Sequence, residues 1–127
     1  MFLRKLLLWL NGLAFSATGL LGFISTRDLV EFVGYKLTSG AAHTEFVANY
    51  GGLYLFYGVY LCWCGTGFGR TRQGISVLCF TSFGLATGRA IGSMTAGVID
   101  SAQLFFWLWE IATGLLTLGL LFKSKKH

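Results

Sequence analysis

The stretch Ser76-Val-Leu-Cys-Phe-Thr-Ser-Phe-Gly-Leu-Ala-Thr-Gly-Arg-Ala-Ile-Gly-Ser-Met94 decides the fold, because it is a hydrophobic run that carries one arginine, Arg89. Its length is close to the roughly 20 apolar residues that an α-helix needs to cross a bilayer. A charged side chain in the hydrocarbon costs at least about 2.5–3.5 kcal/mol, and a guanidinium keeps its proton at any ordinary pH. Arg89 must therefore meet an anion, a water-filled cavity or the headgroup region.

Apolar runs of this kind account for most of the 127 residues. Hydrophobic residues make up 54% of the chain and charged residues only 12%, whereas a soluble domain has about 25% charged residues. The sequence therefore predicts one all-α integral membrane domain over residues 1–127, folded as a four-transmembrane-helix bundle. The predicted membrane helices cover residues 6–24, 46–64, 75–94 and 102–122.

The positive charge lies mainly on one side of this predicted topology. Arg27 and Lys36 fall in the first connection. The ends of the chain and the second connection carry the larger group, which consists of Arg4, Lys5, Arg70, Arg72, Lys123, Lys125 and Lys126. The positive-inside rule then places both termini and the second connection in the cytoplasm, for a multi-pass protein of the bacterial cytoplasmic (inner) membrane. This distribution of the net charge of +5 argues against a nucleic-acid partner.

The first connection, residues 25–44, contains its own helix signal. Ser25-Thr-Arg-Asp28 resembles a helix start, with a hydroxyl cap and an acid in the first turn. Leu29 and Phe32 fall on one face, and Gly34 is a natural stop. We expect a short helix that lies on the outer membrane interface and covers the bundle.

Two acidic residues are predicted to lie at a depth similar to that of Arg89. Glu45 opens the second run and shares a helix face with Asn49 and Gly52. Glu110 lies roughly 12 Å inside the fourth run at 1.5 Å per residue, so it must be paired or protonated. We expect Arg89 to pair with Glu45, with Glu110 or with both. The alternatives are that Arg89 reaches lipid phosphates and that Glu45 caps its own helix.

Small and polar residues indicate the contact faces of the runs. Gln103, Trp107 and Glu110 lie on one stripe of the fourth run, and Asn11 is expected to bond to a neighbouring helix. In the first run, a seam of small residues comprises Gly12, Ser16, Gly19 and Phe23. The other glycines predicted to pack helices closely are Gly51, Gly52, Gly84, Gly88 and Gly92.

The sequence gives no sign of metal or catalytic chemistry. Cys62, Cys64 and Cys79 would lie toward the cytoplasmic side, with no matching histidine there, so we interpret them as packing residues. No cysteine–histidine, serine–lysine or zinc motif is present. We therefore assign no catalytic residue, metal, cofactor or enzyme class.

At Glu45…Tyr50-Gly51-Gly52, at Gly88-Arg89 and at Glu110 the sequence resembles a family of small four-helix bacterial membrane proteins. That family is catalogued as a domain of unknown function within a DoxX-like group, and the resemblance extends over nearly the whole chain. It implies the four-helix fold but no established reaction. The DoxX-like grouping implies an association with quinone- or redox-linked membrane systems.

Three functional hypotheses follow. The favoured one is a binding module that holds a small lipophilic or anionic ligand, quinone- or lipid-like, in the outer half of the bundle. Arg89 would meet its polar head, and Tyr50, Phe106 and Trp107 would form the walls. The alternatives are a structural or accessory subunit of a membrane complex and a proton-linked transport component. The expected partners are the lipid bilayer, such a molecule, and a second copy or a membrane-complex subunit.

Overall fold

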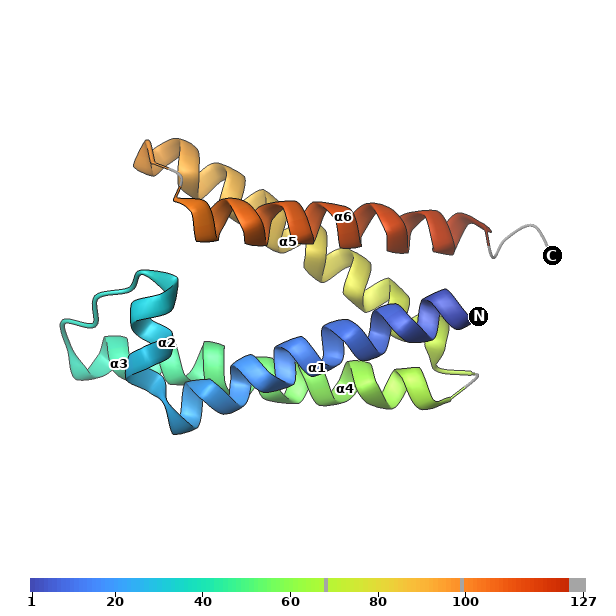
Figure 1. Ribbon diagram of the computed structural model, residues 1–127, viewed down its shortest axis with the longest axis horizontal. Helices are drawn as coiled ribbons and strands as arrows, with labels where there is room; N and C mark the ends of the chain where they lie inside the picture. Colours follow the sequence, from blue (N-terminus) through green and yellow to red (C-terminus); the bar gives the residue numbers. More distant parts are fainter. Residues whose placement is uncertain (68, 99, 124–127) are drawn as a thin grey trace.

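The computed structural model describes residues 1–67, 69–98 and 100–123, and within these ranges the chain is helical without strands (Figure 1). The elements are α1 (Phe2–Ile24), α2 (Thr26–Val33), α3 (Gly40–Phe46), the π-helix η1 (Val47–Leu53), α4 (Tyr54–Thr66), α5 (Thr71–Ala96) and α6 (Ser101–Lys123). The all-α fold class is therefore confirmed. Lys125 and Lys126, which contributed to the predicted topology, lie outside the described residues.

Three of the predicted runs correspond to long helices. Among the described residues, α1, α5 and α6 are long and apolar enough to cross a membrane. Each begins a little before the predicted first residue, because the helix extends beyond the apolar run from which it was predicted. Arg4 and Lys5 lie in the first turn of α1, and Arg72 lies in the first turn of α5.

The second predicted run, residues 46–64, lies within one continuous helical path that α3, η1 and α4 form together. Val47 and Tyr54, at the two junctions, both have right-handed helical backbone angles. With 13 residues, α4 alone is shorter than the roughly 20 needed for a span. The whole segment from residue 40 to residue 66 exceeds that length. Its π-helix contains the adjacent glycines Gly51 and Gly52.

The long helices form two pairs. α1 packs along α4, and α5 packs along α6, whereas contacts between the two pairs are few (Figure 1). The buried core gathers where the pairs meet and consists of Leu7, Leu8, Leu61, Cys64, Ile75 and Leu78. We call this part the closed end. At the other end, the open end, the two pairs diverge, and the start of α1 lies far from it (Figure 1).

Glycines let α1 and α4 approach each other closely. A Cβ added to Gly58 would overlap the backbone of Ser16 and the carbonyl oxygen of Gly12. One added to Gly19 would overlap the backbone of Leu55. The predicted small-residue seam of α1 is therefore present, and its partner is α4.

The glycines of η1 are also close to α1. A Cβ on Gly22 would meet the backbone of Gly51 at 2.7 Å. A Cβ on Gly52 would only reach ordinary contact distance from Phe23, at 3.9 Å. The predicted close approach therefore holds at Gly51, and the packing at Gly52 is looser.

The prediction that Gly84, Gly88 and Gly92 pack against another helix is wrong within the described chain. All three are exposed, and a Cβ on any of them would meet no atom within 4 Å. The reason is the rotation of α5, which directs Ser82 and Ala86 toward the protein interior. The glycines occupy a different face of the same helix.

The short helix predicted after the first run is present as α2. It ends at Gly34, whose φ of 80° is left-handed and therefore suits glycine. Leu29 on its inner face is buried. α2 lies at the open end, beside the gap between the two helix pairs (Figure 1).

We expect Gly58→Ala to lower the free energy of unfolding by about 1–3 kcal/mol, because the added methyl overlaps backbone atoms of α1. Gly84→Ala is the matched control, since its methyl enters open space. Unfolding of the purified protein in mild detergent, followed by circular dichroism, measures both. Equal destabilisation by the two substitutions would contradict the helix pairing.

Candidate functional site at the open end

Arg89 on α5 forms an ion pair with Glu110 on α6. Its Nε donates hydrogen bonds to both carboxylate oxygens, at 2.8 and 3.0 Å. Its Nη1 donates to the side-chain oxygen of Gln103. The Glu110 side chain is only 9% exposed and that of Arg89 20%. Of the partners predicted for Arg89, the structure selects Glu110.

The ion pair leaves part of the guanidinium unused. A guanidinium has five N–H donors, and Glu110 is held through the single Nε–H. Among the described residues, no atom accepts a hydrogen bond from Nη2 of Arg89. The ring of Phe106 lies 5.2 Å from the central carbon of the guanidinium. Arg89 is thus neutralised and oriented while it keeps free donors.

The local sequence explains why these groups meet. Gln103, Phe106 and Glu110 lie three and four residues apart, so they share one face of α6. Asp100 caps the start of α6 by accepting a hydrogen bond from the backbone nitrogen of Gln103 at 2.8 Å. The connection between α5 and α6 is short, which makes the two helices antiparallel neighbours. Their side chains then meet near the open end.

A cavity of about 720 Å³ lies beside the ion pair, between the two helix pairs. This volume falls within the range of roughly 300–1,000 Å³ that is usual for small-molecule sites. Much of its wall is apolar, including Phe15, Leu21, Leu29, Phe32, Leu85 and Phe106. Its polar groups other than the ion pair include Asn11, Asp28, Tyr50, Tyr54 and Ser82.

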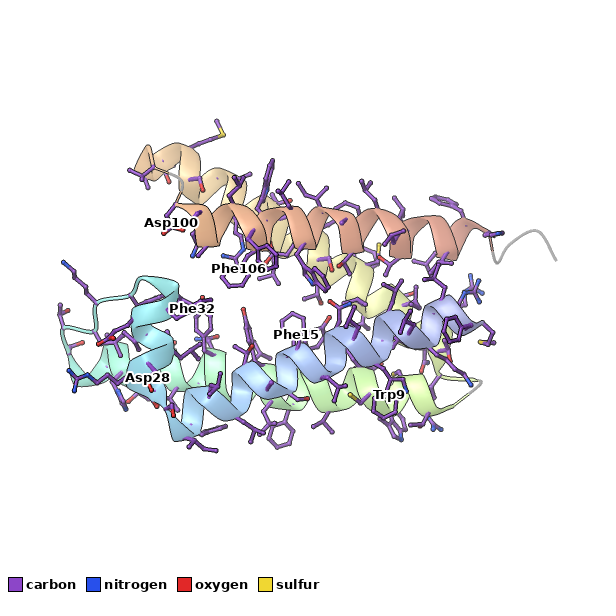
Figure 2. The ribbon with its side chains drawn as sticks, viewed as in Figure 1. Trp9, Phe15, Asp28, Phe32, Asp100 and Phe106 are labelled. Carbon is purple, nitrogen blue, oxygen red and sulfur yellow. The ribbon has the colours of Figure 1, made fainter. Side chains whose placement is uncertain are left out.

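α2 closes part of the open end of this cavity. Phe32 from α2 and Phe106 from α6 meet edge to face, with ring centroids 6.0 Å apart (Figure 2). Phe15 projects from α1 into the gap and packs edge-on against Tyr54 at 5.0 Å (Figure 2). Aromatic side chains from both helix pairs therefore surround the space next to Arg89.

A polar contact connects the helix pairs on another side of the cavity. Asn11 of α1 is 2% exposed and accepts a hydrogen bond from Trp109 Nε1 of α6 at 3.3 Å. Its amide nitrogen donates to the backbone oxygen of Leu7 at 3.0 Å. The expectation that Asn11 bonds to a neighbouring helix is therefore confirmed.

Two of the predicted site residues lie elsewhere. Glu45 and Asn49 are exposed and do not line the cavity. The Asn49 side chain donates to the backbone oxygen of Glu45 at 2.8 Å, within its own helix. The adjacent positions Phe46 and Tyr50 turn inward instead. Of the open alternatives, the one in which Glu45 also pairs with Arg89 is therefore wrong, because Glu45 lies on an exposed helix face outside the cavity.

The remaining predicted site residues line two separate spaces. Tyr50 lines the cavity. Trp107 and Gln103 line a second groove of about 510 Å³ between the ends of α5 and α6, and Arg89 lines both spaces. The indole nitrogen of Trp107 donates to the backbone oxygen of Ala86 at 3.1 Å, which ties α6 to α5.

Several cavity residues were not predicted from the sequence, among them Phe15, Tyr54, Ser82 and Trp109. Tyr54 follows Tyr50 by one helical turn, so the same helix face could have identified it. Phe15 and Ser82 carry no comparable sequence signal, because either would suit a packed helix interface.

We expect Arg89→Leu to lower the free energy of unfolding by about 3–5 kcal/mol, because it leaves the buried carboxylate of Glu110 uncompensated. The double variant Arg89→Leu/Glu110→Leu should recover most of this loss. Arg27→Leu is the control, since Arg27 and Glu31 form an exposed pair and no measurable change is expected. Additive losses in the double variant would contradict direct coupling.

Comparison with known protein families assigns the chain to a family. Residues 3–121 match the family described as Domain of unknown function (DUF4345). No curated protein and no solved structure matches the chain. The DoxX-like grouping stays a prediction. Because the match covers nearly all of a helical chain with three apolar helices long enough to span a membrane, the chain belongs to the DUF4345 family of unknown function.

Proposed function

We propose that the protein binds a small lipophilic molecule in the cavity at the open end, with the polar head of that molecule on Arg89. The same proposal makes it a four-span protein of the bacterial cytoplasmic membrane, with α3, η1 and α4 together as the second span. Both termini would lie in the cytoplasm.

The distribution of charge supports this orientation. Arg4, Arg70 and Arg72 belong to the segments at the closed end, where α4 leads into α5 and α1 begins. By the positive-inside rule this end faces the cytoplasm. The cavity, which lies toward the opposite end, would then occupy the outer half of the membrane, as the sequence hypothesis requires.

The single observation that carries the proposal is the large apolar cavity next to the partly buried guanidinium of Arg89, which uses only some of its donors. An ion pair that merely held two helices together would need no adjacent space, and protein interiors are normally close-packed. Apolar walls with one polar end fit a molecule that has a hydrocarbon body and a polar head.

A structural role in a larger membrane complex is the second candidate. It is favoured by the hydrogen bonds of Arg89, which join α5 directly to α6 through Glu110 and Gln103. The transport hypothesis required two glutamates beside Arg89. Because Glu45 is exposed and does not line the cavity, that hypothesis loses its basis.

We expect a small molecule to co-purify with the wild type in mild detergent and to be lost from Ala14→Trp. Ala14 lines the cavity, so the indole would occupy the ligand's space while Arg89 and Glu110 are both kept. Ala112→Trp is the matched control, because Ala112 is exposed and does not line the cavity. Mass spectrometry of the extracted small molecules measures retention in all three proteins.

Arg89→Leu completes this experiment by testing the head group. The amount of small molecule that this variant retains should fall at least tenfold, which corresponds to the loss of one charge-assisted hydrogen bond of about 1.5–3 kcal/mol. Equal retention by the wild type and Ala14→Trp would exclude the cavity as the binding site. An empty wild type combined with a destabilised Arg89→Leu would favour the structural role.

A further inference from the structure

We infer that the head group recognised at Arg89 is a neutral hydrogen-bond acceptor, such as a ketone or ester carbonyl, and not an anion. This inference rests on the proposed function and narrows its ligand class. It follows from three features of the cavity: the charges on its wall, the free donors of Arg89 and the position of Asp28.

The first feature is the charge on the wall. Among the described residues, the charged side chains that line the cavity are one cation, Arg89, and two carboxylates, Asp28 and Glu110. The charge of Arg89 is already compensated, since both oxygens of Glu110 lie within 3.0 Å of Nε. An anionic head would therefore be a third negative group beside a single cation. The repulsion from Glu110 is the stronger of the two, because this carboxylate is buried and water screens it less, whereas Asp28 is exposed.

The second feature is the donor capacity of Arg89. Its Nη2 has two N–H groups and no acceptor among the described residues. A carbonyl oxygen satisfies such donors and brings no charge into the cavity. A plain hydrocarbon fills the same space but leaves the donors unsatisfied, which costs free energy in an apolar site.

The third feature is the position of Asp28 on α2. Asp28 is exposed at the open end, yet it also lines the cavity. It lies on the helix whose Phe32 packs against Phe106 (Figure 2). An anion that entered past α2 would approach a carboxylate before it reached Arg89. A neutral molecule meets no such barrier.

The test uses three photoreactive probes with the same diazirine-bearing alkyl chain. One ends in a methyl ketone, one in a sulfonate that stays ionised at every pH used, and one in a methyl group. Each is added to the full chain in phosphatidylcholine nanodiscs, and labelled peptides are identified by mass spectrometry. We expect the ketone to label cavity-lining peptides of the wild type at least fivefold more than either other probe.

Two carboxylate variants make the test specific. Glu110→Gln keeps an acceptor for Nε of Arg89 but removes the compensating charge, so sulfonate labelling should rise at least fivefold while ketone labelling persists. Asp28→Asn, at an exposed position, should raise sulfonate labelling without disturbing the fold. This second variant remains informative if Glu110→Gln fails to fold. The matched control for Asp28→Asn is Glu31→Gln, because Glu31 lies on the same helix as Asp28 but does not line the cavity.

The outcomes separate the inference from the proposed function. If the sulfonate labels the wild-type cavity as strongly as the ketone, the inference is overturned and the binding function stands. If the probe that ends in a methyl group labels the wild-type cavity as strongly as the ketone, recognition of the head group by Arg89 is overturned. If no probe labels the cavity, the proposed function fails and the inference fails with it.

Discussion

The structure depends on one electrostatic constraint, which is that Arg89 must be compensated in apolar surroundings. The guanidinium stays charged, so α5 can adopt only orientations that bring it to an acceptor. Glu110 and Gln103 of α6 provide the acceptors. Once that contact is made, the rotation of α5 is determined. Ser82 and Ala86 turn inward and Gly84 and Gly88 turn outward.

The distribution of small residues explains why the molecule is tightly packed at one end and hollow at the other. Glycines on α1 and α4 bring these two helices into backbone contact along their lengths. In the described residues, the core of buried aliphatic side chains that joins both helix pairs lies at the closed end. Toward the open end, the contacts between the pairs in the described part of the chain include the hydrogen bond between Asn11 and Trp109 and the ring contact between Phe32 and Phe106. A cavity persists there because aromatic rings line the space without filling it.

The π-helix contributes to the shape of this cavity. It lies where the segment from residue 40 to residue 66 passes the open end, and it includes Tyr50. A π-helical turn contains more residues than an α-helical turn, which changes the direction of the side chains that follow. Tyr50 and Tyr54 both face the cavity, whereas Glu45 and Asn49 face away from it. Such turns are frequent at functional sites, which agrees with a binding role for this region.

The sequence by itself determined the helical class, the three long apolar helices, the short helix that ends at Gly34, and the need of Arg89 for a partner. These features follow from local properties, namely hydrophobic length, glycine conformation and the cost of a buried charge. Only the tertiary structure decided that Glu110 is that partner, that Glu45 is not, and that the glycines of α5 face outward. Helical spacing tells which residues share a face, but the direction of that face depends on how the helices pack against one another. The cavity has the same origin, because it is bounded by residues from helices that are distant in the sequence.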